Sequence, residues 1–180
     1  SVVAGLRRAD RPGLRSARLM AEERAPRRLA AILAVDVVGY SRLMEQEGLP
    51  VVLTGTMATH EQELLAAVHQ ECRAAPVDLT GRLSLKELGA IINKARLFFG
   101  MDSAPMHLAA AVNTPAVALF GPSGVFNWGP WGEGHLVIQK DWDCVPCGKD
   151  GCEGAKVSRC LVELTPAEVV ARMERHFGQI

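Results

Sequence analysis

Polar residues stand directly after two apolar segments in the middle of the chain. Asp102-Ser103 follow an apolar run at residues 97–99, and Gly121-Pro122-Ser123 follow a second run at residues 116–120. Both runs predict buried strands of a parallel sheet, and open α/β folds bind ligands at the carboxyl ends of such strands. A helix that opens after Ser103 adds free amides and a positive dipole end, which suit a phosphate. The pattern therefore favours a nucleotide or nucleotide-sugar site.

The side chains around the first turn differ in what they can bind. Ser103 can offer its hydroxyl and amide to a phosphate, and His107, four residues further along, is expected on the same helix face, where it can donate to a phosphate or sugar oxygen. Asp102 carries its own negative charge, so it suits capping the helix or accepting hydrogen bonds from sugar hydroxyls. An ordinary capped helix with a half-buried histidine explains the same spacing, so spacing alone leaves both interpretations open.

Four cysteines form a second constellation, with the spacing Cys144-x2-Cys147-x4-Cys152-x7-Cys160. Four clustered thiolates would suit tetrahedral zinc in a structural role, or an iron–sulfur cluster. Disulfides and unligated thiols are the alternatives that the spacing leaves open. Cys72 stands alone and is interpreted as a small buried hydrophobic residue.

Alternating strand and helix patterns predict the α/β fold class, with a Rossmann-like parallel sheet. We expect strands at residues 50–53, 97–99, 116–120 and 136–138, and helices at residues 61–70, 105–112 and 166–177. Ser84-x-x-Glu87 and Thr165-x-x-Glu168 each predict a capping box at a helix start. The residues expected to face inward from the helix after Ser84 are Leu85, Leu88, Ile91 and Ile92. For Trp128, Trp131 and His135 we favour a role in covering the sheet over lining a sugar site.

Length and charge set the organisation of the chain. Its 180 residues suit one domain with an appendage, and the net charge of zero hides a basic segment at residues 1–28, with eight Arg against three acidic residues. We interpret this segment as a flexible, solvated arm and expect no nucleic-acid partner, although contact with anionic lipid suits the same charge. With neither a secretory signal nor a membrane-length apolar run, we expect a cytoplasmic protein.

Roughly the last three quarters of the chain resembles the donor-binding domain of glycosyltransferase family nine, the ADP-heptose:lipopolysaccharide heptosyltransferases. The residues that carry this resemblance, in family order, are Gly48–Gly55, Asp78–Leu85, Asp102–Ser123, Trp128–Gly132, His135, Cys144-x2-Cys147, Cys160-Leu and Leu164–Val169. The resemblance implies one half of a GT-B enzyme, at residues 49–180, that binds an ADP-sugar without an obligatory metal or cofactor. It implies transfer of the sugar, heptose, to a lipopolysaccharide core acceptor.

The resemblance also implies roles for particular residues. Asp102, Ser103, Ala104 and His107 match the donor motif, although the family usually has glycine where this chain has Ala104. Glu61, or Glu63 in its place, is implied to contact ribose hydroxyls, and adenine is implied to pack around Leu83. The loop ends expected to approach the diphosphate through their backbones are Thr54, Gly55, Gly121, Pro122 and Ser123. The family's acceptor domain supplies the catalytic base, so we expect no catalytic residue here and little turnover by the chain alone. Contact with the inner membrane and pairing of copies are compatible with this interpretation.

A second, shorter resemblance covers residues 20–47, which look like the start of a bacterial class III adenylate/guanylate cyclase. The residue that matches a metal-binding carboxylate of that family is Asp36, in Ala34-Val-Asp-Val-Val-Gly-Tyr. No later segment supplies a second metal carboxylate, and one carboxylate cannot hold two metal ions and position a triphosphate. We therefore interpret residues 29–48 as a cyclase-like strand and helix fragment, in which residues 29–38 supply an edge or docking strand. A cyclase remnant and a non-catalytic module held by the cysteines remain the alternatives to a transferase domain.

Overall fold

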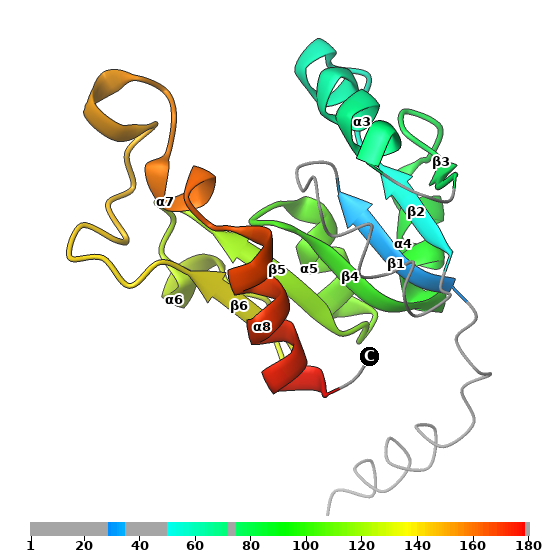
Figure 1. Ribbon diagram of the computed structural model, residues 1–180. Helices are drawn as coiled ribbons and strands as arrows, with labels where there is room; N and C mark the ends of the chain where they lie inside the picture. The colour runs from blue at the N-terminus through cyan, green and yellow to red at the C-terminus, as the bar shows by residue number, and fades with distance from the viewer. Residues whose placement is uncertain (1–28, 35–49, 72–74, 179–180) are drawn as a thin grey trace, which may run out of the picture.

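A parallel six-stranded sheet forms the centre of the molecule, in the strand order β3-β2-β1-β4-β5-β6 (Figure 1). The computed structural model describes residues 29–34, 50–71 and 75–178. The strands are β1 (Leu29–Ala34), β2 (Val51–Thr54), β3 (Val77–Asp78), β4 (Ala95–Met101), β5 (Ala116–Phe120) and β6 (Leu136–Gln139). The helices are α3 (Thr59–Glu71), α4 (Leu85–Lys94), α5 (Ala104–Ala111), α6 (Val125–Trp128), α7 (Arg159–Val162) and α8 (Pro166–Phe177), with a 3-10 turn, η1, at Cys152–Gly154. The predicted α/β fold class with a parallel sheet is confirmed.

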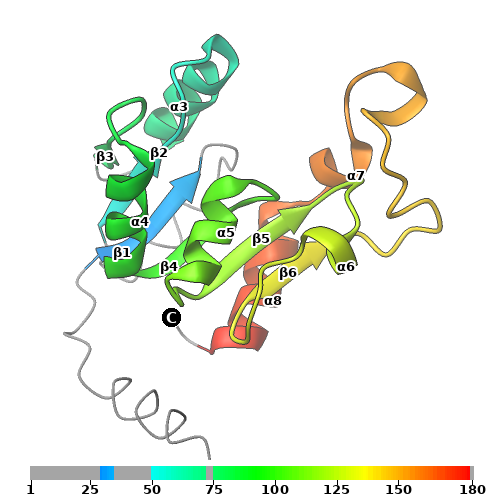
Figure 2. The ribbon, with the colours of Figure 1, turned by 180° about the vertical axis from the view of Figure 1, so that it is seen from behind.

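Helices cover both faces of the sheet, because successive strand residues point to opposite sides. On one face, Val117 and Leu119 of β5 pack with Val169 and Met173 of α8, in a core that also includes buried residues of α3. On the other face, Ala118 and Phe120 belong to a core formed with α4 and α5 (Figure 2). The strands are thus apolar on both sides, as expected for a covered parallel sheet.

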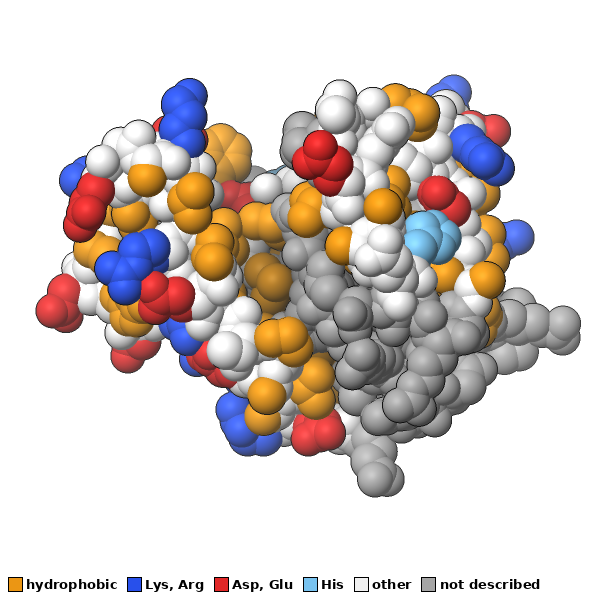
Figure 3. All heavy atoms as spheres, turned by 45° about the horizontal axis from the view of Figure 1, so that its top comes forward, with side chains coloured by type: hydrophobic (Ala, Val, Ile, Leu, Met, Phe, Trp, Pro, Cys, Tyr) orange, Lys and Arg blue, Asp and Glu red, His pale blue; other side chains and the backbone are white. Residues whose placement is uncertain are grey.

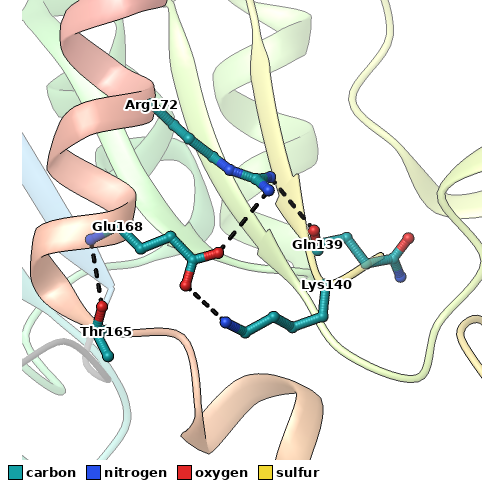
Figure 4. A network of polar contacts seen from close by, with 5 residues as sticks. All are labelled: Gln139, Lys140, Thr165, Glu168 and Arg172. Carbon is teal, nitrogen blue, oxygen red and sulfur yellow. Dashed lines mark hydrogen bonds and ion pairs between the residues drawn. The ribbon is translucent and has the colours of Figure 1, made fainter. Parts of the chain in front are cut away.

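The two predicted capping boxes differ in the structure. At α4, the Ser84 side chain accepts from the Glu87 amide and the Glu87 carboxylate accepts from the Ser84 amide, so the predicted box is complete. At α8, Thr165 Oγ1 accepts from the Glu168 amide at 3.3 Å, but the Glu168 carboxylate turns to Lys140 at 2.6 Å (Figure 4). The second box is therefore only half formed, because the basic side chain that follows β6 binds the carboxylate.

The strand before residue 49 is an interior strand of the sheet. β1 pairs in parallel with β2 on one side and with β4 on the other, in the registers Ala31–Val51 and Ala31–Leu97. The expectation of an edge or docking strand in this segment is therefore wrong. The rest of the cyclase-like segment, including Asp36, lies outside the described residues, as do the basic arm at residues 1–28 and Cys72.

Other boundaries differ from the sequence expectation in small ways. β4 continues through Gly100 to Met101 instead of ending at residue 99, and the short elements β3, α6 and α7 were not anticipated. Leu85 is 64% exposed rather than facing the core, because it is the first residue of α4 and lies at the rim of a cleft. Among the described residues, no helix has the length and apolar character that crossing a membrane requires.

Candidate functional site

A cleft of about 530 Å³ opens where the strands end, beside the point at which the sheet reverses its strand order between β1 and β4. Its lining residues come from the segments after β2, β3 and β4 and from α3, α4 and α5: Thr54, Gly55, Thr56, Glu61, Leu79, Leu83, Leu85, Leu88, Met101, Asp102, Ser103 and Pro105. In Figure 3, with this edge turned toward the viewer, the surface is hollowed between two raised parts of the molecule, and hydrophobic side chains gather along the hollow.

Six of the predicted donor-site residues line this one cleft: Thr54, Gly55, Glu61, Leu83, Asp102 and Ser103. They come together because parallel strands bring their carboxyl ends to the same edge of the sheet. The cleft combines an apolar wall around Leu83 with carboxylates at Glu61 and Asp102. The residues that the sequence analysis missed are mainly apolar: Leu79, Leu85, Leu88, Met101 and Pro105, with Thr56.

A local hydrogen bond holds the part of the cleft wall that α3 contributes. Glu61 Oε2 accepts a hydrogen bond from the amide of Thr56, which ties the loop after β2 to the first turn of α3. Thr54, at the end of β2, is buried, whereas Gly55 and Thr56 are exposed. The loop therefore presents backbone groups to solvent beside the cleft.

The start of α5 differs from the expected cap. The N-cap residue is Ser103, whose side chain makes no capping bond and whose hydroxyl donates to the Met101 carbonyl at 3.2 Å. Asp102 lies before the cap, and its amide donates to Leu119 of β5 at 3.2 Å. The expectation that Asp102 caps the helix is therefore wrong. Its carboxylate lies at the cleft, where it suits hydrogen-bond donors of a ligand.

Two residues of the predicted donor motif stand outside the cleft lining. Ala104 and His107 are exposed on α5, and neither contributes to the wall of the cleft. Ser103 is the N-cap residue, and its carbonyl accepts from the His107 amide at 3.4 Å, so the two residues are one helical turn apart.

Hydrogen bonds to its carbonyl groups hold the second predicted turn, at residues 121–123. The Gln139 side-chain amide donates to the carbonyls of Gly121 at 2.8 Å and Ser123 at 2.9 Å. The Gly148 amide donates to the carbonyl of Pro122 at 2.8 Å. These three residues do not line the cleft, but they follow β5, which pairs with β4, the strand that Asp102 follows.

The aromatic residues after this turn do not cover the sheet. Trp128 is 58% exposed and Trp131 is 89% exposed, so the interpretation that they shield the sheet is wrong. The His135 Nε2–H group donates to the Trp131 carbonyl at 3.1 Å, and partial burial lowers the pKa of this imidazole. The Gly-rich loop that carries them therefore leaves both tryptophans to solvent.

The four cysteines are free thiols along one segment that runs from β6 to α7. Cys144 and Cys147 are exposed, Cys152 is half-buried and Cys160 is buried. Burial raises the pKa of the Cys160 thiol, and the neighbouring cysteines raise it further. In the part of the chain that the structure describes, no three His, Cys, Asp or Glu side chains are grouped closely enough to hold a metal ion. As they are arranged here, the cysteines do not fit the predicted tetrahedral site.

Comparisons with known proteins show the family to which the chain belongs. Residues 40–158 match the family model described as glycosyltransferase family 9 (heptosyltransferase). Lipopolysaccharide heptosyltransferase 3 of Escherichia coli is 43% identical over 89 residues, which cover 49% of this chain and 26% of that protein. Lipopolysaccharide heptosyltransferase 2 of Escherichia coli K12 is 35% identical over 141 residues, which cover 74% of this chain and 40% of that protein.

Solved structures give the same result for the fold. The structure of Escherichia coli ADP-heptose lipopolysaccharide heptosyltransferase II superposes with a TM-score of 0.64 at 26% identity, over 95% of this chain and 53% of that one. The iron-containing dodecameric heptosyltransferase TibC, in complex with ADP-D-beta-D-heptose, has a TM-score of 0.60 at 16% identity, over 86% of this chain and 46% of that one. The chain thus spans about half the length of the solved structures it matches. Its family model covers most of the described sheet, and the chain belongs to glycosyltransferase family 9, the heptosyltransferases.

Proposed function

We propose that this chain is the donor-binding part of a glycosyltransferase that transfers a heptose from an ADP-sugar to a lipopolysaccharide core acceptor. The observation that carries the proposal is the cleft at the carboxyl edge of the sheet, with an apolar wall and two carboxylates. An adenine ring needs an apolar surface, and ribose or sugar hydroxyls need acceptors such as carboxylates.

In this proposal, each side of the cleft binds a different part of the ADP-sugar. Adenine packs on Leu83 and its apolar neighbours, and Glu61 accepts a hydrogen bond from a ribose hydroxyl. The diphosphate lies toward the start of α5, where the Ser103 backbone and the positive end of the helix dipole favour negative charge. Asp102 then accepts hydrogen bonds from hydroxyls of the transferred sugar, since its own charge disfavours a phosphate neighbour.

Five residues outside the cleft lining also belong to the proposed donor site, on the strength of spacing and family resemblance. We propose that Ala104 and His107 lie on the sugar-phosphate side of α5. Residues 121–123, like Gly55 of the cleft lining, approach the diphosphate through their backbones. His107 is exposed, so its imidazole is accessible to a phosphate or sugar oxygen.

The acceptor side of the reaction is proposed from the family alone. An acceptor hydroxyl attacks the anomeric carbon directly, its proton passes to a carboxylate base, and ADP leaves with inversion of the sugar. We assign no catalytic residue to this chain, because in this family the acceptor domain supplies the carboxylate base. The reaction is placed at the cytoplasmic face of the inner membrane, where nucleotide-sugars and the growing core meet.

Binding to the purified chain tests the proposal. Isothermal titration with ADP and ADP-heptose is expected to show saturable binding, with UDP and GDP as controls. Replacing Asp102 by Ala is expected to weaken ADP-heptose binding by at least about tenfold, or about 1.4 kcal/mol. The matched control is Asp143→Ala, which removes an exposed carboxylate outside the cleft lining. Absence of saturable ADP-sugar binding by the folded chain, or equal affinity of the two variants, would overturn the proposal.

A further inference from the structure

Every carbonyl group of the turn at residues 121–123 has a hydrogen-bond donor. Three consecutive carbonyl oxygens, those of Gly121, Pro122 and Ser123, each accept a hydrogen bond from outside the turn. Two of the three come from the single side-chain amide of Gln139, at 2.8 and 2.9 Å, so both of its N–H groups are used. One side chain therefore fixes both ends of this turn.

The turn is also held by close contacts on the side of α7. Gly121 is buried, and a Cβ atom built on it would come within 2.6 Å of the Leu161 side chain. A side chain at this position would therefore force the Leu161 side chain of α7 to move. With the Gly148 amide bonded to Pro122, the cysteine-bearing segment and β6 hold the turn from two directions.

Gln139 is itself anchored to the last helix. Its backbone carbonyl accepts from Arg172 Nη1 at 3.3 Å, and Arg172 lies 3.8 Å from the Glu168 carboxylate (Figure 4). The same carboxylate binds Lys140, the residue after Gln139, at 2.6 Å. The end of β6 is therefore fixed to α8 while the Gln139 side chain reaches over to the turn after β5.

Fixing the carbonyls also fixes where an amide points. In a trans peptide unit the C=O and the N–H point in opposite directions, so the Ser123 amide points away from the Gly148 segment that binds the Pro122 carbonyl. Among the described residues, the Ser123 amide donates to no acceptor. This backbone donor is accordingly held in one direction, and its hydrogen bond is not used within the described residues.

We infer that Gln139 is a positioning residue of the donor site, which acts on the donor diphosphate only through the turn at residues 121–123. The inference rests on the proposed function, in which the backbone of this turn approaches the diphosphate. In this inference the Gln139 side chain fixes the backbone of the turn and thereby sets the affinity for the diphosphate. Gln139 itself does not contact the nucleotide.

The experiment separates phosphate binding from nucleoside binding. Titrations of the full chain with ADP and with adenosine are compared for the wild type, Gln139→Glu and Gln139→Met. Both variants keep the length of the side chain and remove the two donors, and the Glu variant also sets a carboxylate against two carbonyl groups. We expect ADP binding to weaken by about fivefold or more while adenosine binding stays within about twofold, because only the diphosphate depends on the turn.

Two controls make the outcome decisive. Val169→Ala removes buried side-chain volume from α8 without touching the turn, so it is expected to lower stability and leave both affinities unchanged. Folded Gln139 variants with wild-type ADP affinity, or an equal loss for ADP and adenosine, would overturn the inference and leave the proposed function standing. A wild-type chain that binds neither ligand would overturn both.

A measurement on the wild-type chain covers the case in which the variants do not fold. In a nitrogen-15 NMR titration, the Ser123 amide resonance is expected to shift with ADP and not with adenosine. A Ser123 amide that is unmoved at saturating ADP contradicts the inference whatever the variants do.

Discussion

Replacing Glu168 by Gln tests whether the ionised carboxylate at the start of α8 stabilises the fold. Glu168 lies 2.6 Å from Lys140, and the two side chains are only 29% and 18% exposed. Hydrogen bonding to Lys140 and the charges of Lys140 and Arg172 outweigh the effect of burial and hold the pKa of Glu168 below its ordinary value. The substitution keeps the shape of the side chain, removes its charge, and replaces one of the two oxygens that face Lys140 and Arg172 by an amide NH2 group.

The expected size of the effect follows from the kind of bond that is lost. A hydrogen bond to a charged group contributes roughly twice as much as a neutral one, about 1.5–3 kcal/mol, and the partial exposure of this pair reduces that figure. We therefore expect Glu168→Gln to lower the free energy of unfolding by about 1–2 kcal/mol at pH 7. For a chain of this size this corresponds to a fall in Tm of about 3–6 °C.

The effect should depend on pH in one direction. Because the folded-state pKa of Glu168 is lowered, its contribution is fully present above the ordinary carboxyl pKa of about 4.3 and is lost as the pH falls through and below that value. Wild type and variant should therefore differ at pH 7, and the difference should shrink as the pH falls below about 4.3 and the wild-type carboxyl takes up its proton.

Urea unfolding followed by circular dichroism, at a series of pH values, measures this difference. The matched control is Glu163→Gln, which removes a carboxylate from an exposed pair with Arg159 at 2.7 Å and is expected to change stability little. A difference below about 0.5 kcal/mol at pH 7, or one that persists undiminished near pH 3, would refute the assignment of the stabilisation to the ionised Glu168.

Three further predictions follow from buried groups and from the cysteines. Thr114→Val removes the bond from the buried Thr114 hydroxyl to the Ile92 carbonyl at 2.8 Å, so it should lower the free energy of unfolding by about 1–2 kcal/mol, which denaturant unfolding would detect. Met173→Ala empties a position that is 1% exposed and should cost about 2–5 kcal/mol in the same assay. Thiol titration with a chromogenic disulfide at neutral pH should modify exposed Cys144 and Cys147 rapidly and Cys160 slowly, since Cys160 is buried and its thiol pKa is raised. Protection of all four thiols that a chelator relieves would instead indicate a bound metal.

The fold was predictable where local patterns decide it. The box at Ser84 and Glu87 formed because both partners lie within one helical turn, and the buried strand at residues 116–120 was evident as an apolar run. The same local pattern at Thr165 and Glu168 failed in part, because Lys140 comes from 28 residues earlier in the chain and binds the carboxylate more strongly. The periodicity of a sequence does not show which distant segments come into contact.

The candidate site was predictable in its polar residues and not in its walls. Asp102 and Ser103 stand after a strand, so their place at the cleft followed from the rule for parallel sheets. Leu85 and Met101 have the same apolar character as core residues, so nothing in the sequence separates a cleft wall from the interior. The two hydrogen bonds from the Gln139 side chain to the turn at residues 121–123 were not predicted, because their acceptors lie 18 and 16 residues away along the chain.

The interior position of β1 has a consequence for how this protein can be divided. β1 is the only described strand that connects the β3–β2 pair to the β4–β5–β6 group. A shortened chain that starts at residue 49 would leave two partial sheets with exposed inner edges, which are prone to pair with other molecules. The domain boundary expected near residue 49 therefore does not coincide with a position at which the described sheet can be divided.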